Sequence, residues 1–338
     1  MDLADCAVAG MAAALAGVVD VLLVQVPRHR SFLGSPAHEG GYLSNVVREK
    51  FGELFPPKSI RQLEREYPVS FDPSISSKLA VPVDGPEPRT HRFHSLGHDP
   101  LLAWIFGVSD VLHGTFTAID KFGHVVRQSN PGAGAIEPGL ELFEAVLGAF
   151  RRVLGHLLSD VPTPAGVSAP LMPLLLFVQT GSIGPRGYTI AEVARQMYRA
   201  GFDFRHFLAG SISTVLVEII VRGAWVIRRL HEGSKLAELL PDAKHPRLRK
   251  TLLVAHSGAA AINAGKIYFT GPLGLNWSQW LTLSRYAARQ TAAFIADENG
   301  GRRHAAIDRI LADDWTILSQ QVHATWKASA GAIEATRI

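Results

Sequence analysis

The stretch from Ala4 to Val26 carries only two charged residues, Asp5 and Asp20, and it constrains the fold more than any other feature. A membrane-spanning helix needs roughly 20 apolar residues, and a charge near its centre costs a few kcal/mol. Acidic rather than basic residues precede this stretch, which is atypical of a secretory signal. We therefore expect either a membrane span or a helix buried in protein, with Asp20 paired or facing a cavity.

The composition favours burial of apolar surface and excludes some kinds of site. Hydrophobic residues make up 47% of the 338 residues and charged residues 19%, whereas soluble domains carry about 25% charge. The formal net charge of +4 comes with no dense basic face, so we expect no nucleic-acid partner. Cys6 is the single cysteine, which excludes an internal disulfide and a thiolate zinc cluster and fits a reducing compartment. Any metal site must use His, Asp and Glu.

Prolines divide the chain into three predicted regions. Residues 1–55 should form the apolar helix and an amphipathic helix, and residues 56–90 should form a proline-rich connection. Residues 91–338 should form the main helical domain. No alternating strand pattern of useful length is present. We therefore predict a mostly α fold, a multi-helix bundle with a long proline-rich irregular excursion, associated with a membrane.

Local signals predict individual helices in the main domain. Asp99 followed by Pro100 should start one helix that runs to about Ile119. The segment TIAE, from Thr189 to Glu192, is a capping box. Asp203 should start a long apolar helix, in which Glu218 and Arg222 can pair on one face.

Histidines and aspartates gather in two segments, HRFHSLGHDP (His91 to Pro100) and GHLLSD (Gly155 to Asp160). In the second segment, His156 and Asp160 are four residues apart, which places both on one helix face. A catalytic zinc ion takes about three protein ligands and a water. We expect His94 or His98 to join His156 and Asp160 as metal ligands, with zinc as the expected ion. His113 and His206 are further candidates.

Each of these residues also has a structural interpretation. A His and an Asp four residues apart on a helix often serve only as a hydrogen-bonded cap, and Asp160 stands at a predicted helix end. Asp99 is explained as a helix cap, although we also predict it as the catalytic residue, acting as a general base or orienting a ligand imidazole.

The two segments together resemble the bacterial membrane-bound metal-dependent hydrolases, whose helical core is similar to zinc-dependent phospholipase C. The family's first motif is HRG-x-THS, and its second has a His and an Asp four residues apart, then a Thr and a Gly. The first segment here is two residues shorter and lacks the glycine, and only His29 or His38 could supply the family's N-terminal ligand. The resemblance covers about residues 90–170. The residues that match the two motifs are His91, Arg92, His94, Ser95, His156, Asp160, Thr163 and Gly166.

The resemblance implies a metal-dependent hydrolase that acts on a phosphoester or another ester at a membrane surface. Together with the single cysteine, it leads us to expect a membrane-associated protein on the cytoplasmic side, with membrane lipid as partner and scope for a homo-oligomer. The alternative is a non-enzymatic helical component of a membrane, an assembly or a defence system, in which the histidines are structural. The hydrolase hypothesis requires the candidate ligand side chains to lie close together in the fold, whereas the alternative does not. These residues are His94, His98, His156 and Asp160.

Overall fold

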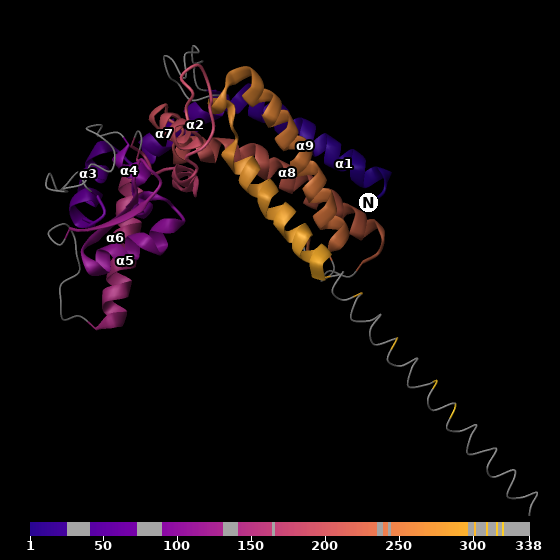
Figure 1. Cartoon of the computed structure of the whole chain (residues 1–338). Helices are drawn as coiled ribbons and strands as arrows, with labels where there is room; N and C mark the ends of the chain where they lie inside the picture. The colour runs from indigo at the N-terminus through magenta and orange to yellow at the C-terminus, as the bar shows by residue number, and fades with distance from the viewer. Residues whose placement is uncertain are drawn as a thin grey trace, which may run out of the picture. The chain divides into compact units, whose positions relative to one another are not determined.

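The computed structural model confirms a mostly α fold (Figure 1). It describes residues 1–25, 41–72, 90–130, 141–163, 166–234, 239–242, 245–296 and the single positions 301, 309, 316 and 320. Contacts divide the chain into two units, Met1–Leu283 and Ser284–Ile338. The second unit is helical at each of its described residues. Everything below concerns the first unit.

Three helices form a bundle in which α1 packs against both α8 and α9 (Figure 1). Helix α1 spans Leu3–Val19, α8 spans Phe204–His231 and α9 spans Pro246–Thr270. Small residues let the backbones approach closely. A Cβ atom added at Gly258 would lie 2.9 Å from that of Ala13, and one added at Gly17 would lie 2.7 Å from Ile262. Larger side chains at these glycines would push α1 and α9 apart.

Asp20 lies inside this bundle, at the start of a π-helical turn, Asp20–Val24, that extends α1. Its carboxylate accepts hydrogen bonds from Asn263 at 2.8 Å and Asn276 at 2.9 Å, and Lys266 Nζ lies 3.1 Å away. Lys266 also donates to the Asp20 carbonyl at 2.9 Å. We call these four residues the bundle cluster. The expectation that Asp20 is paired is therefore confirmed.

Shorter elements build the part of the unit between α1 and α8. The helices are α2 (Tyr42–Leu54), α3 (Pro57–Glu66), α4 (His91–His94), α5 (Phe106–His113), α6 (Leu142–Asp160) and α7 (Ile190–Arg199). Short 3-10 helices cover Leu96–His98, Leu102–Trp104 and Met172–Phe177. After α9, Pro272–Gly274 forms a further 3-10 helix, and residues 277–283 are helical. Helix α6 packs against α3 and α5. Within the predicted proline-rich connection, residues 73–89 lie outside the described residues, and Pro57–Glu66 forms α3.

The prediction of one helix from Asp99 to Ile119 is wrong. Helix α5 ends at His113 because Gly114 adopts the left-handed conformation, with φ 59° and ψ 46°. Two antiparallel strands follow, β1 (Thr115–Ile119) and β2 (Val125–Ser129), with Thr117 opposite Arg127. Threonine and phenylalanine favour extended backbone over helix, and Asp110 accepts hydrogen bonds from Thr115 and Thr117 that hold β1 against α5.

The other local signals agree with the structure. Thr189 and Glu192 form the predicted capping box at α7, and Asp203 caps α8 by accepting from two backbone amides. Arg222 Nε lies 2.5 Å from Glu218. Two apolar cores flank α4 and the 3-10 helix that follows it: one contains Phe93, Leu96 and Tyr198, and the other contains Phe71 and Val153. The segment that carries the candidate histidines is therefore held between two cores.

Candidate metal centre

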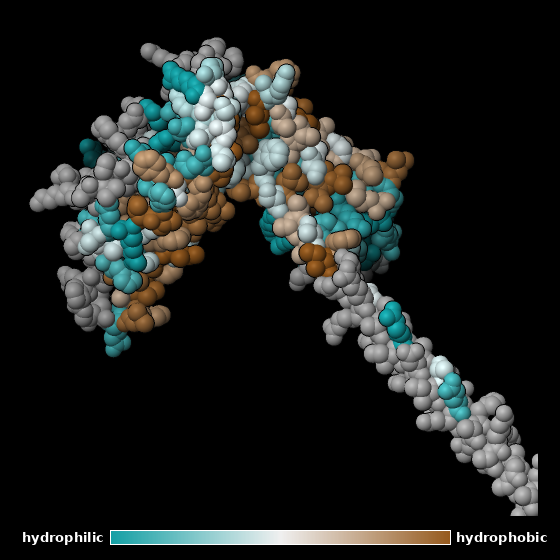
Figure 2. All heavy atoms as spheres, in the orientation of Figure 1, coloured by the Kyte–Doolittle hydropathy of each residue, from teal (hydrophilic) through white to brown (hydrophobic). Residues whose placement is uncertain are grey.

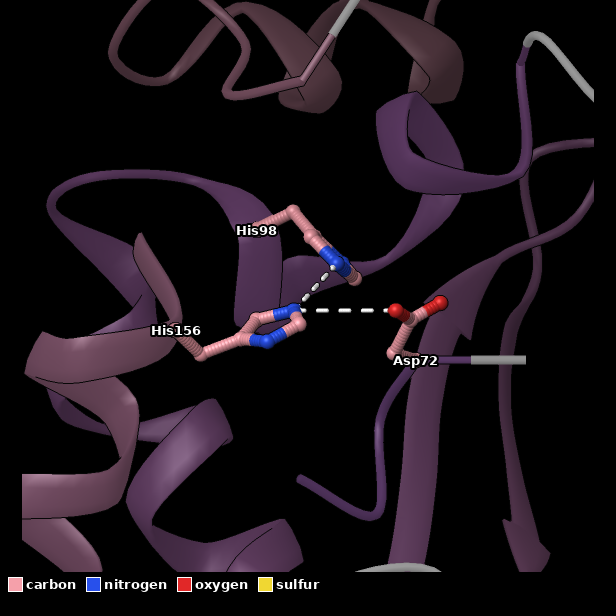
Figure 3. A group of neighbouring side chains, drawn as sticks. All are labelled: Asp72, His98 and His156. Carbon is pink, nitrogen blue, oxygen red and sulfur yellow. Dashed lines mark hydrogen bonds and ion pairs between the residues drawn. The ribbon is translucent and has the colours of Figure 1, made fainter. Parts of the chain in front are cut away.

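Four side chains from three places in the chain meet beside α6. His156 and Asp160 come from consecutive turns of α6, as the four-residue spacing predicts. His98 ends the 3-10 helix after α4, and Asp72 follows the buried Phe71. Figure 3 shows Asp72, His98 and His156 pointing toward one another. We call these four residues the histidine cluster.

The candidate ligand atoms in this cluster lie close together. His98 Nε2 and His156 Nε2 are 3.3 Å apart, and Asp160 Oδ2 lies 3.4 Å from each of them. Asp72 Oδ2 lies 3.8 Å from His156 Nε2. Ligands about 2.0 to 2.2 Å from a tetrahedral zinc ion lie about 3.3 to 3.6 Å from one another. The separations in the cluster are close to that spacing.

The cluster is buried, and its polar atoms are incompletely hydrogen-bonded within the described part of the chain. His98 and Asp160 have no exposed surface, and His156 is 2% exposed. Neither oxygen of Asp160 makes a hydrogen bond, although Oδ1 lies 3.1 Å from Arg92 in an ion pair. Buried polar atoms without such partners cost free energy, so this arrangement needs an explanation. The group formed by Asp72, His98 and His156 could hold a metal ion, and Asp160 Oδ2 lies 3.4 Å from both imidazole Nε2 atoms of that group.

Burial shifts the pKa values of Asp160 and His98 in opposite directions. Burial raises the pKa of Asp160 above its ordinary value, while His156 and Arg92 oppose that rise. Burial, helped by the neighbouring His156, lowers the pKa of His98 well below its ordinary value. His98 therefore stays neutral at physiological pH, and neutral imidazole is the form that binds a metal ion.

A phenylalanine ring positions the two imidazoles. Phe71 meets the rings of His98 and His156 edge-on, with centroids 5.1 and 5.6 Å away. A Cβ atom at Gly97 would lie 2.5 Å from the Phe71 ring. Only glycine at position 97 leaves the space that this ring occupies.

The end of α6 is closed by a tight turn. The backbone carbonyl of Asp160 accepts hydrogen bonds from both the amide and the hydroxyl of Thr163. A Cβ atom at Gly166 would lie 1.9 Å from the same carbonyl oxygen. Thr163 and Gly166 thus fix the backbone of Asp160 and hold its side chain at the end of the helix.

The structure brings His98, His156 and Asp160 together but places His94 elsewhere. His94 Nδ1 lies 2.6 Å from the carbonyl oxygen of Ile119, so this buried ring links α4 to β1. His113 and His206 also lie outside the cluster, with Nδ1 atoms near the Ser109 carbonyl and the Ser44 hydroxyl.

The prediction that Asp99 is catalytic does not fit its surroundings. Oδ1 of Asp99 accepts from the amides of Leu101 and Leu102, and Oδ2 accepts from the amide of Leu171 at 2.6 Å. Burial raises the pKa of Asp99, although these three hydrogen bonds oppose the rise. The carboxylate is fully occupied in joining two segments of backbone, which agrees with the alternative interpretation as a cap.

Asp72 is the member of the cluster that the sequence patterns did not indicate. It lies at the start of the proline-rich region, where prolines suggest an irregular surface connection. Asp72 follows Val69 and Phe71, whose side chains are fully buried. In an extended segment, alternation places Asp72 on the face opposite to these two residues, so local spacing does not predict that it is buried.

Comparison with known proteins gives no match. No protein-family model, curated protein or solved structure is similar to this chain. The features of the molecule that bear on function are the geometry of the histidine cluster and the apolar surface of the helices.

Proposed function

We propose that this protein is a membrane-associated metal-dependent hydrolase that acts on a phosphoester or another ester. The observation that carries the proposal is the convergence of His98, His156 and Asp160, with Asp72 beside them, at separations that suit one divalent ion. Bound there, zinc would supply a nucleophilic water at neutral pH. Of the two segments that resemble the bacterial membrane-bound hydrolases, the second supplies His156 and Asp160 to the cluster, whereas His94 of the first lies outside it.

The chain's own residues would prepare the centre in three ways. As metal ligands, His98 and His156 would bind through imidazole nitrogens, and Asp160 and Asp72 would supply negative charge that offsets the charge of a divalent ion. Phe71 covers both imidazoles and limits their contact with water. The turn formed by Thr163 and Gly166 fixes Asp160, because its carbonyl is held on both sides.

The membrane part of the proposal comes from the long helices. Leu3–Val24 and α8 are both long and apolar enough to cross a membrane, and only 39% and 33% of their most apolar windows are buried in protein. Figure 2 shows apolar residues on the surface of the molecule. Those on these two segments, at least 40% exposed, are Leu3, Met11, Leu15, Val18, Val21, Leu22, Ile212, Val215, Ile219, Ile227 and Leu230.

Metal content is the decisive test. The full chain, purified in detergent, should retain close to one zinc ion per chain by elemental analysis after dialysis against zinc-free buffer. The double variant His98→Ala/His156→Ala should retain none. The matched control is His124→Ala, which removes an exposed histidine on the hairpin. Equal zinc in all three proteins, or ester hydrolysis by a metal-free sample, would refute the proposal.

Membrane association has a separate test. Membranes from cells that express the full chain should keep the protein in the pellet after washes with high salt and alkaline carbonate, and detergent should release it. Release by salt alone would show that the apolar helices are not embedded in lipid.

A further inference from the structure

Arg92 lies between the two carboxylates of the histidine cluster. Its Nη1 atom is 3.1 Å from Asp160 Oδ1, and its Nη2 atom is 3.9 Å from Asp72 Oδ2. Nη1 also donates to the hydroxyl of Thr163 at 3.4 Å. Arginine stays protonated in proteins, so these ion pairs hold a charged guanidinium at the edge of the cluster.

This edge is where the cluster meets solvent. The side chains of His91 and Arg92 are 24% and 18% exposed, whereas those of His98 and Asp160 are 0% exposed. Arg92 also has a buried Nε atom that makes no hydrogen bond within the described part of the chain. A guanidinium that uses only part of its donor set keeps capacity for one more acceptor.

The net charge of the metal-loaded centre, with Arg92 included, indicates which class of molecule it would bind. Two ionised carboxylates balance one divalent ion, and the two imidazoles are neutral as ligands. Arg92 then leaves the loaded centre with about one net positive charge in a buried, weakly screened position. Such a centre attracts an anion more strongly than a neutral ester.

We propose that Arg92 forms an anion-binding subsite of this metal centre and that the substrate is a phosphoester rather than an uncharged carboxylic ester. This inference rests on the proposed function, since the positive charge depends on a bound divalent ion. Arginine suits the role because its planar fork donates to phosphate oxygens in parallel. The phosphoester can belong to a lipid headgroup or to a soluble molecule, because both offer the same anionic oxygens.

Binding of inorganic phosphate tests the subsite without relying on activity. Calorimetric titration of phosphate into the zinc-loaded full chain should show binding that disappears in zinc-free protein. Arg92→Gln should weaken phosphate binding roughly 10- to 100-fold, as expected for loss of a charge-assisted hydrogen bond, and Arg92→Lys should fall between the two. Arg186→Gln, which changes an exposed loop arginine, should bind phosphate like the unchanged protein. Zinc content should stay the same in every variant.

The outcomes separate this inference from the proposed function. Absence of zinc from the unchanged protein refutes the proposed function itself. Zinc-loaded Arg92→Gln that binds phosphate normally refutes only the subsite. Loss of zinc from both Arg92 variants would mean that Arg92 merely positions Asp160, which also overturns the subsite. Preferential cleavage of p-nitrophenyl butyrate over p-nitrophenyl phosphate and over phospholipid in mixed micelles would refute the substrate class, and the last two substrates distinguish a soluble from a lipid source.

Discussion

The bundle cluster around Asp20 and the histidine cluster around His98 are both buried, and both contain carboxylates. The Asp20 carboxylate accepts hydrogen bonds from Asn263 and Asn276 and pairs with Lys266. The Asp160 carboxylate forms ion pairs but makes no hydrogen bond within the described residues. Complete pairing within the protein is what a structural polar cluster requires, whereas incomplete pairing indicates a place for a ligand.

The largest expected effect is in the bundle cluster. Asp20→Ala should destabilise the fold by about 3 to 5 kcal/mol, because Lys266 would remain buried without its partner. Thermal unfolding followed by tryptophan fluorescence in detergent measures this effect. The double variant Asp20→Leu/Lys266→Met should recover much of the loss. A single variant as stable as the unchanged protein would remove the contrast between the two clusters.

Zinc should stabilise the protein through the histidine cluster. At a free zinc concentration about 100 times the dissociation constant, binding to the folded state alone adds about 2.7 kcal/mol. The unfolding midpoint of the metal-stripped chain should therefore rise when zinc is added. His98→Ala/His156→Ala should show no rise, while Asp20→Ala should still show one. A rise in the histidine double variant would place the metal elsewhere.

The effect of zinc should depend on pH. Because burial raises the pKa of Asp160 above 3.8, the metal-free fold holds this proton more tightly than the unfolded chain does. Asp160 therefore stabilises the metal-free fold below about pH 3.8, and this stabilisation is lost as the pH rises through the raised pKa. The lowered pKa of His98 acts oppositely: stability falls as the pH drops below 6.5, because the unfolded chain takes up the proton.

A bound ion requires ionised Asp160, so stabilisation by zinc should grow as the pH rises. Unfolding midpoints with and without zinc between about pH 4 and pH 8 measure this trend. In the metal-free state, Asp160→Asn should lack the part of the pH dependence that Asp160 contributes. A pH-independent effect of zinc would mean that Asp160 does not exchange its proton for the metal.

The smallest effect should come from His94. His94→Asn removes a single buried hydrogen bond to Ile119, which typically contributes about 1 kcal/mol. The variant should keep its zinc content and zinc affinity unchanged. A tenfold loss of zinc affinity would show that His94 contributes to the metal centre and that the cluster is wider than the four residues.

The sequence predicted those parts of the site that depend on residues close together in the chain, and it missed those that depend on distant contacts. The pairing of His156 with Asp160 follows from helix geometry, and His98 lies in a segment with three histidines. Asp72 could not be predicted from spacing, because its position depends on a contact between Phe71 and Gly97 that no local pattern encodes. His94 and His98 were equivalent in the sequence; the turn from α4 into the 3-10 helix separates them, and sequence patterns rarely predict such short turns.

For the fold, too, features set by neighbouring residues were predicted, whereas those set by contacts between distant residues were not. Capping residues identified α7 and α8 correctly, because a cap acts within one helical turn. The run from Leu101 to Ile119 was predicted as one helix because its apolar residues are dense. The structure ends α5 at Gly114, and contacts between Asp110 and the threonines of β1 favour a strand after it. Long-range hydrogen bonds thus overrode the apolar pattern.

The contact between Gly97 and Phe71 lets residue 97 affect the position of Asp72, a carboxylate of the histidine cluster. Phe71 and Asp72 are consecutive, so a side chain at position 97 that displaces the ring must also move the carboxylate beside it. The same position precedes His98 directly. One methyl group added there would therefore disturb Asp72 and His98, two members of the histidine cluster from different parts of the chain, although residue 97 contributes no side-chain atom to the cluster.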